Sequence, residues 1–299
     1  MKRIALVTCE SLPEWEVDDE ALRDAFRQLG VSFEEPAWSA DVDWARFDAC
    51  LIRTTWDYME RREAYLDWAE HVTSVSQLFN PAPILRWNTH KGYLRTFEEA
   101  GIPLAPTLWL PQGARLNLSE TLERQGWSRA LLKPMVGAGA RETIRFSRDT
   151  AELHAAQTHL DRLLAHEDLM LQPYLHSVET EGELSAIFLD GRLTHVVRKI
   201  PVAGDFRVQD DFGASDEVAH LNANERSLAI RIWELAQTRF TGRLLYGRID
   251  FLRDASGSLV LNEVELVEPS LFFRHAPEAG LVLAKGVLKR LESKGTSRQ

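Results

Sequence analysis

Three carboxylates in the C-terminal third of the chain have the types and spacing to bind a divalent metal ion. Asp250 lies in the apolar segment YGRIDFL, and Glu263 and Glu265 lie two positions apart in LVLNEVEL. Because side chains alternate along a strand, Glu263 and Glu265 share one face. Like charges on adjacent antiparallel strands are destabilising unless a cation lies among them, and magnesium takes carboxylate and phosphate oxygens. The pattern therefore predicts a magnesium site.

Arg248 shares a face with Asp250 in the first of these two segments. A simpler interpretation is a solvated acidic sheet face with Arg248 as its counter-ion. The apolar neighbours of both segments favour a buried sheet instead, where an unpaired charge is costly.

A run of small residues follows Lys133 in the segment ALLKPMVGAGARETIRF. Gly137 and Gly139 would let backbone amides approach a phosphate, and a loop with so little side-chain bulk can close over a ligand. The run matches neither the P-loop nor the GxGxxG pattern, so taken alone it is better explained as a structural loop.

The N-terminal part of the chain alternates apolar strands with a helix, which is typical of a parallel α/β sheet. We expect strands at residues 4–8, 31–33 and 49–52, and a helix over residues 18–29 that ends at Gly30.

Ligands bind beyond the carboxyl ends of such strands, so the loop after Ile52 is a candidate substrate-binding loop. Its residues are Arg53, Thr54, Trp56, Asp57 and Tyr58. The alternative is that the aromatic residues pack in the core and that Arg53 and Asp57 form a local ion pair.

The proline-rich stretch at residues 80–88 is expected to be a linker that closes the first lobe, since proline cannot continue a helix. A helix over residues 89–100, capped by Asn88, would then carry Lys91 in its first turn. We expect an N-terminal α/β domain at 1–85 and two α+β lobes at 86–170 and 171–299. Further expected elements are helices at 149–164, 223–240 and 276–292, and a hairpin turned at Asp190-Gly191.

The composition excludes several classes of function. Asp and Glu outnumber Lys and Arg by 45 to 35, so nonspecific nucleic-acid binding is not expected. The first apolar run is too short for a signal peptide or a membrane span, which predicts a cytoplasmic protein without membrane contact. Cys9 and Cys50 lack any zinc-ligand spacing and are expected to be buried, reduced thiols.

Several short motifs occur together in one order along the chain. They are Asn88-x-x-Lys91, Gly101-Ile102-Pro103, Lys133-Pro134, Gln172-Pro173-Tyr174-Leu175 followed by Glu179, Arg248-x-Asp250 and Glu263-x-Glu265. No single element is specific, but the ordered set resembles the ATP-grasp superfamily. The resemblance covers roughly residues 85–275 and implies an α/β fold in which two lobes clamp ATP after a preceding α/β domain.

The resemblance also implies site roles. Lys91 and Lys133 would contact the phosphates, under a loop containing Gly137 and Gly139. The adenine pocket would be lined by Gln172, Pro173, Tyr174 and Leu175, and Glu179 would bind the ribose. Asp250, Glu263 and Glu265 would hold the magnesium ions, most simply two.

The catalytic groups implied by the resemblance are basic. Lys199 and Arg207 would lie near the γ-phosphate and the acyl-phosphate oxygens. Arg248 and Ser270 could grip an amino-acid carboxylate, which suits a bidentate guanidinium.

A narrower resemblance is to bacterial ligases with a TTWDY loop, a W-N-x-x-K helix and an ELxEPSL segment, among them the cyclo-ligase type that closes O-ureido-D-serine to D-cycloserine. Here these segments are Thr54–Tyr58, Trp87–Lys91 and Glu265–Leu271. Two positions depart from the usual ATP-grasp pattern: Glu265 stands where asparagine is usual, and Pro173 where many members have glutamate.

The resemblance implies an ATP- and magnesium-dependent ligase that joins a carboxylate to an amine through an acyl phosphate. The substrate would be a small amino acid or derivative, and ligation could be intermolecular or an intramolecular ring closure. The alternatives are a nucleotide-binding protein without ligase activity and a phosphotransferase acting on a small carboxylate. The oligomeric state is open, a homodimer included.

Overall fold

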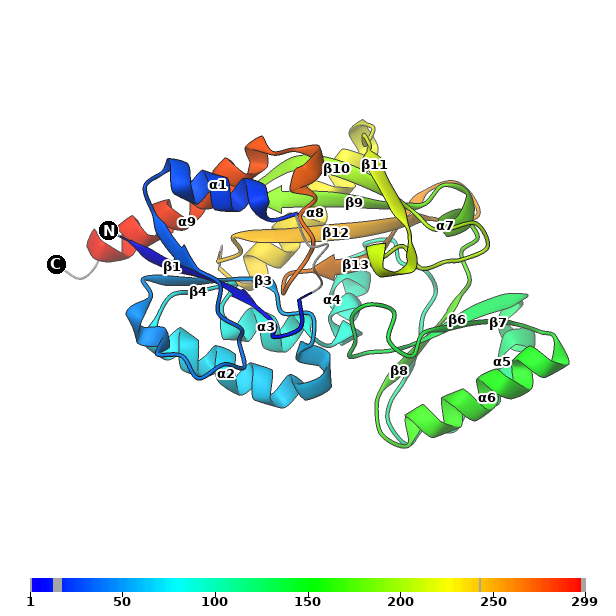
Figure 1. Ribbon diagram of the computed structural model, residues 1–299. Coiled ribbons are helices and arrows are strands. Elements are labelled where there is room, and N and C mark those ends of the chain that lie inside the picture. Colours follow the sequence, from blue (N-terminus) through cyan, green and yellow to red (C-terminus); the bar gives the residue numbers. More distant parts are fainter. Residues whose placement is uncertain (1, 13–17, 242, 297–299) are drawn as a thin grey trace.

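The structure is a computed structural model that describes residues 2–12, 18–241 and 243–296. These residues form three β-sheets with helices packed against them (Figure 1). The three sheets surround a central space in which the candidate site lies.

The N-terminal sheet is parallel and has the strand order β2-β1-β3-β4. Its strands are β1 (Arg3–Thr8), β2 (Ser32–Glu34), β3 (Ala49–Thr54) and β4 (Leu78–Phe79). One face packs on α1 (Glu20–Gln28) and the C-terminal helix α9 (Glu278–Thr296), and the other on α2 (Arg62–Val75). The expected parallel α/β arrangement is confirmed. The central strands β1 and β3 carry buried apolar side chains on both faces, which need a helical cover on each side.

The proline-rich stretch is a helix, so the expectation of a linker there is wrong. It forms α3 (Ala82–Asn88), with Pro81 as the N-cap residue and Pro83 in the first turn. Proline is tolerated there because first-turn amides have no partner within the helix. Asn88 ends this helix instead of capping the next one, and its amide bonds the backbone of Val264 and Leu266 at 2.7 Å each.

The helix expected at residues 89–100 is divided. Lys91 lies in a 3-10 turn, η3 (Lys91–Tyr93), and α4 (Leu94–Glu99) follows it. The turn is fixed by the Lys91 amide, which donates to the Met135 carbonyl at 2.6 Å. This contact holds Lys91 beside the Gly-rich loop.

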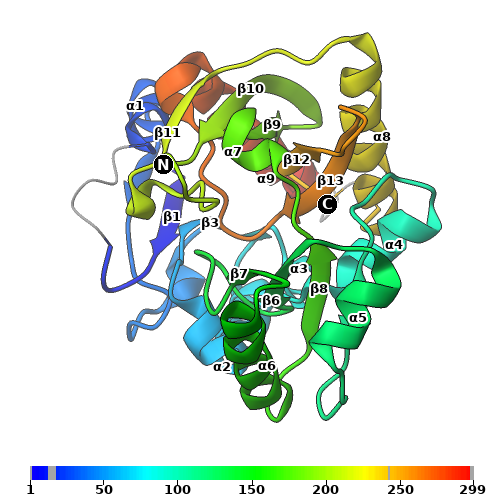
Figure 2. The ribbon, with the colours of Figure 1, turned by 90° about the vertical axis from the view of Figure 1, so that its right-hand side faces the viewer.

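The middle sheet is antiparallel, with the order β5-β8-β6-β7. Its strands are β5 (Leu108–Leu110), β6 (Arg129–Pro134), β7 (Ile144–Ser147) and β8 (Leu169–Pro173). Helices α5 (Leu118–Gln125) and α6 (Thr150–Leu164) pack on its outer side, away from the large sheet (Figure 2). The inner side of this sheet is left to face the cavity.

The large sheet is antiparallel and has the order β11-β10-β9-β12-β13. Its strands are β9 (Glu183–Leu189), β10 (Arg192–Ile200), β11 (Ser215–Val218), β12 (Tyr246–Arg253) and β13 (Leu259–Glu265). Helix α8 (Ala223–Arg239) covers one face, where Trp233 stacks on Phe188. The hairpin at Asp190-Gly191 is confirmed, and both residues have positive φ, as a type I′ turn requires.

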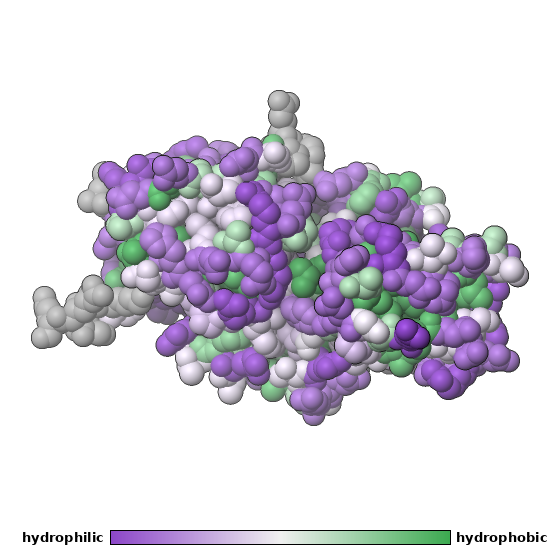
Figure 3. Space-filling view, turned by 90° about the horizontal axis from the view of Figure 1, so that it is seen from below, coloured by the Kyte–Doolittle hydropathy of each residue, from purple (hydrophilic) through white to green (hydrophobic). Residues whose placement is uncertain are grey.

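One face of the molecule is mostly polar. Seen from below, polar residues cover most of the molecule, and apolar residues lie in small groups among them (Figure 3). Within the described ranges, no helix is both long enough and apolar enough to cross a bilayer.

Candidate active site

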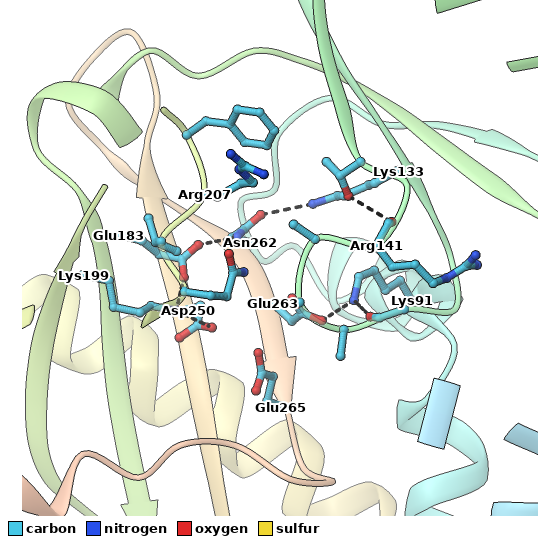
Figure 4. Close-up of a pocket in the computed structure, with 18 of the residues that line it drawn as sticks. Lys91, Lys133, Arg141, Glu183, Lys199, Arg207, Asp250, Asn262, Glu263 and Glu265 are labelled. Carbon is cyan, nitrogen blue, oxygen red and sulfur yellow. Dashed lines mark hydrogen bonds and ion pairs between the residues drawn. The ribbon is translucent and has the colours of Figure 1, made fainter. Parts of the chain in front are cut away.

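A cavity of about 300 Å³ lies where the three sheets meet. The loop after β3, the Gly-rich loop after β6, the segment after β8 and the inner face of the large sheet all line it. Its volume is at the lower end of the range for small-molecule sites. Charged side chains from β10, β12, β13 and the Lys91 turn point toward one another across it (Figure 4).

The register of β12 and β13 sets the arrangement of the charged residues. Arg248 lies opposite Glu265, and Asp250 lies opposite Glu263. The predicted convergence of three carboxylates on one sheet face is therefore correct. The register shifts after Asp250, leaving Asn262 without an opposite residue. This irregularity is a β-bulge, which lets Asn262 line the cavity beside Glu263.

The face is buried, so the alternative of a solvated acidic surface is wrong. Asp250 is 2% exposed. It accepts hydrogen bonds from Arg248 Nε at 2.9 Å, from Lys199 Nζ at 3.3 Å and from Ser185 Oγ at 2.5 Å. Burial raises the pKa of Asp250, but Arg248 and Lys199 outweigh it and lower this pKa to about 2. Asp250 is thus a fixed anion.

Protein cations also pair with the other two carboxylates. Lys91 forms an ion pair with Glu263, and Arg248 Nη2 donates to Glu265 at 2.6 Å. Burial nevertheless raises the pKa of Glu265 to about 7, because Glu263 and Asp250 oppose the effect of Arg248. Cations of the protein, Lys91, Lys199 and Arg248, therefore already lie among these carboxylates, so the charge argument alone does not require a metal ion.

The two predicted phosphate-binding lysines lie between the Gly-rich loop and strand β13. Lys91 Nζ donates to the Gly137 carbonyl at 3.0 Å, and Lys133 Nζ to Asn262 Oδ1 at 3.4 Å. Burial, assisted by the charge of Lys91, lowers the pKa of Lys133 to about 8. Gly137 and Gly139 line the cavity between them. Both lysines are positioned to meet an anion.

The predicted adenine-binding segment lines the cavity at the end of β8, through Gln172, Pro173, Tyr174 and Leu175. Glu179 lies just outside this lining, where it accepts from Arg145 Nη1 at 2.5 Å and also pairs with the Tyr174 hydroxyl.

The loop between β10 and β11 contributes Arg207, and β10 contributes Lys199. Lys199 forms ion pairs with both Glu183 and Asp250, whereas Arg207 pairs with Asp205 at 2.7 Å and lies over the Phe212 ring. Lys199 is therefore at the centre of the acidic cluster, and Arg207 lies at its rim.

The predicted substrate loop after β3 is divided between two environments. Trp56 and Tyr58 line the cavity. Arg53 is 2% exposed and donates two hydrogen bonds to Asp19, at 2.8 and 2.9 Å. The Thr54 hydroxyl bonds the Thr8 hydroxyl. Asp57 accepts a hydrogen bond from the Trp38 indole. These three lie outside the lining, and the suggested Arg53–Asp57 ion pair is wrong.

The lining residues that the sequence analysis missed include Arg141, Glu183, Asn262 and Glu268. Alternation could have found Glu183, which precedes the in-facing Ser185 by two positions in β9. Asn262 depends on the bulge, and Glu268 follows the strand, so no periodic pattern marks either residue.

The oxygen donors fit magnesium, although they are not preassembled as a metal cage. Among the described residues, no group of three or more His, Cys, Asp or Glu side chains is arranged to hold a metal ion. Magnesium usually takes only one or two carboxylates, together with waters and phosphate oxygens. Asp250, Glu263 and the neighbouring Asn262 amide supply such a set, so the metal roles stay a prediction.

Comparison with known proteins agrees with this geometry. Residues 114–270 match the prokaryotic glutathione synthetase ATP-grasp domain, and residues 4–80 match the N-terminal domain of D-cycloserine synthetase DcsG. The first match covers more than half of the chain, which therefore belongs to the ATP-grasp family.

The similarity to one member extends over the whole chain. The cycloserine biosynthesis protein DcsG of Streptomyces lavendulae is 32% identical over 306 residues, spanning 97% of this chain and 99% of that protein. The crystal structure of D-cycloserine synthetase DcsG superposes with a TM-score of 0.87 at 29% identity, covering 97% of this chain and 99% of the other. The chain is an ATP-dependent ligase that forms carbon–nitrogen bonds.

More distant relatives share the fold. A glutathione synthetase of Prochlorococcus marinus is 27% identical over 237 residues, covering 77% of this chain and 70% of that protein. The D-alanine–D-alanine ligase of Bacillus anthracis, complexed with ATP, has a TM-score of 0.68 at 16% identity, with both chains covered completely.

Proposed function

We propose that this ligase activates the carboxylate of a small amino-acid derivative with ATP and closes or joins it to a nitrogen nucleophile. The leading candidate is intramolecular ring closure of the O-ureido-D-serine type. The observation that carries the proposal is that one cavity is lined both by the phosphate-side groups and by Arg248, Ser270, Trp56 and Tyr58. A nucleotide and a small second substrate can therefore meet within it.

ATP would occupy the side of the cavity between the middle and large sheets. Its base would lie against the segment after β8, and its phosphates beside Lys91 and Lys133 under the Gly-rich loop. Two lysines 42 residues apart in sequence converge there through the Lys91–Gly137 and Lys133–Asn262 contacts. Concentrated positive charge in a partly closed site suits a triphosphate.

Magnesium would be held by Asp250, Glu263 and Glu265, with the Asn262 amide oxygen beside them, and two ions are proposed. The ions would neutralise phosphate charge and so favour phosphoryl transfer. Lys91 and Arg248, which now pair with these carboxylates, would be released to contact the reacting phosphate and the substrate.

The substrate carboxylate would attack the γ-phosphate, giving an acyl phosphate and ADP. The nitrogen would then attack the acyl carbon, and inorganic phosphate would leave. Lys199 and Arg207 would stabilise the phosphoryl oxygens. Arg248, which lines the cavity beside Ser270 and donates to its carbonyl at 3.1 Å, would orient the carboxylate and later the oxyanion. These roles need charge stabilisation more than proton transfer.

The test is to incubate the protein with ATP, magnesium and O-ureido-D-serine, and to measure ADP and the organic product by mass spectrometry. We expect ADP together with a product of the mass of cycloserine. ADP with a phosphorylated product and no new carbon–nitrogen bond would favour a phosphotransferase. ATP binding without ADP release from this substrate or from a panel of amino acids would favour a nucleotide-binding protein.

A further inference from the structure

Glu268 lies at the junction between the large sheet and the N-terminal lobe. It follows β13 by three residues, lines the cavity and is 8% exposed. Its backbone carbonyl accepts a hydrogen bond from the indole nitrogen of Trp56 at 3.2 Å. The contact brings the substrate loop of the first lobe against the segment that carries Glu268.

The carboxylate of Glu268 differs from the other carboxylates of the buried face. Glu183, Asp250, Glu263 and Glu265 each have an ion pair with a lysine or arginine. For Glu268, no ion pair occurs among the described residues. The charge of Lys91 and a hydrogen bond from the backbone amide of Glu268 act on it at longer range or locally and lower its pKa, but they do not outweigh burial. A buried carboxylate without a cation is costly, so this group is suited to a cation that enters with a ligand.

The surroundings of Glu268 also favour a cation. Burial, followed by the charges of Glu265 and Glu263, raises the pKa of Glu268 well above its usual value. The phenol of Tyr58 lies within range of this charge, which adds to burial in raising the pKa of Tyr58. Trp56 and Tyr58 both line the cavity here. Aromatic faces together with a carboxylate attract ammonium groups.

The residues proposed above to bind the substrate carboxylate, Arg248 and Ser270, are connected to the segment that carries Glu268. Ser270 is two residues further on, and its carbonyl contacts Arg248 Nη1 at 3.1 Å. Arg248 also lines the cavity. Residues 268–270 therefore connect the Glu268 carboxylate to the Arg248 guanidinium. These two opposite charges match the ammonium and carboxylate groups of a free amino acid.

We propose that Glu268 binds the α-ammonium group of the substrate and makes the cavity selective for amino acids over the corresponding hydroxy acids. The inference rests on the proposed ligase function, because it takes the activated carboxylate to belong to the same molecule. Glu268 is a specificity residue in this account and takes no part in phosphoryl transfer.

The test measures binding by calorimetry in the presence of magnesium and AMP-PNP. The probes are O-ureido-D-serine and both enantiomers of serine and alanine, with glycerate and lactate as counterparts that replace the ammonium with a hydroxyl. The proteins are the wild type, Glu268→Gln, Glu268→Asp and Glu99→Gln. Glu99 is exposed at the end of α4 and is the matched control.

We expect the wild type and Glu99→Gln to prefer at least one amino acid over its hydroxy acid by about tenfold or more, the value of a hydrogen bond to a charged group. Glu268→Gln should lose this preference, Glu268→Asp should keep part of it, and all four proteins should bind AMP-PNP equally. The inference is overturned if Glu268→Gln keeps the preference, or if the wild type shows none. Absence of AMP-PNP binding by the wild type would instead contradict the proposed ligase function.

Discussion

Arg248 and Asp250, two positions apart on the same strand, form a bidentate ion pair. Arg248 Nε lies 2.9 Å from Asp250 Oδ1, and Nη2 lies 3.0 Å from Oδ2. The two residues are 7% and 2% exposed. Breaking a buried pair of this kind leaves an uncompensated charge. We therefore expect Asp250 to stabilise the fold, apart from any metal role.

Asp250→Asn should lower the free energy of unfolding by about 3–5 kcal/mol, because Arg248 and Lys199 would lose their shared buried anion. Urea denaturation followed by circular dichroism measures the change. Glu265→Gln is the comparison. The Glu265 side chain is 28% exposed, so the loss of its charge should lower the free energy of unfolding by less. Equal midpoints for the two variants would contradict the structural role of Asp250.

The strand pattern that predicts this pair is local, and so it could be found in the sequence. Alternation places Arg248 and Asp250 on one face of their strand, and Glu263 and Glu265 on one face of theirs, whatever the rest of the chain does. The parallel N-terminal sheet follows equally from local apolar runs. The long-range partners do not: Lys91 reaches Glu263 across 172 residues, and no periodicity specifies that contact.

Two expectations drawn from local patterns were wrong. Pro81 and Pro83 indicate a helix break, yet both fit the start of α3. Arg53 was expected in a ligand-binding loop after a buried strand, but it lies within β3, where Asp19 holds its guanidinium away from the cavity. Tertiary pairing overrides the motif at Arg53, whereas at α3 proline fits the first turn of a helix.

ATP affinity should fall as the pH rises through about 8. Burial lowers the pKa of Lys133 to about 8, and only the charged form attracts a phosphate. Below pH 8 the Lys133 ammonium is charged and contributes to ATP binding. Above pH 8 Lys133 must take up a proton when ATP binds, so the affinity for ATP falls by up to about tenfold per pH unit.

Calorimetry with AMP-PNP at pH 7 and pH 9 measures this fall. Lys133→Arg is the control, because a guanidinium remains charged over this range, and its decline should be the smaller one. An equal decline in both proteins would show that another group titrates.

Gly182→Ala should disturb Lys199. A β-carbon at Gly182 would lie 2.3 Å from the Lys199 carbonyl oxygen, and its φ is +75°. Gly191 has a similar φ of +81° but open space around it, so Gly191→Ala shares the backbone strain without the clash. Gly182→Ala should be less stable than Gly191→Ala by about 1–3 kcal/mol and should lose more turnover. Thermal unfolding and ADP release would measure both effects, and equal values would contradict the close contact.

The central claim is that Asp250 of β12 and Glu263 of β13, which lie opposite each other, support magnesium-dependent ATP turnover in a carbon–nitrogen ligase. Glu263 tests it better than Asp250, because its side chain is 24% exposed and the fold should survive Glu263→Gln. The most direct measurement is ADP release with O-ureido-D-serine as a function of magnesium concentration, for the wild type, Glu263→Gln and Glu99→Gln. We predict that the wild type and Glu99→Gln release ADP at the same rate and form one product molecule for each ADP. Glu263→Gln should release ADP more slowly by about a hundredfold or more, since a metal ligand supports several kcal/mol of charge stabilisation. Wild-type rates and magnesium dependence in folded Glu263→Gln would contradict the account.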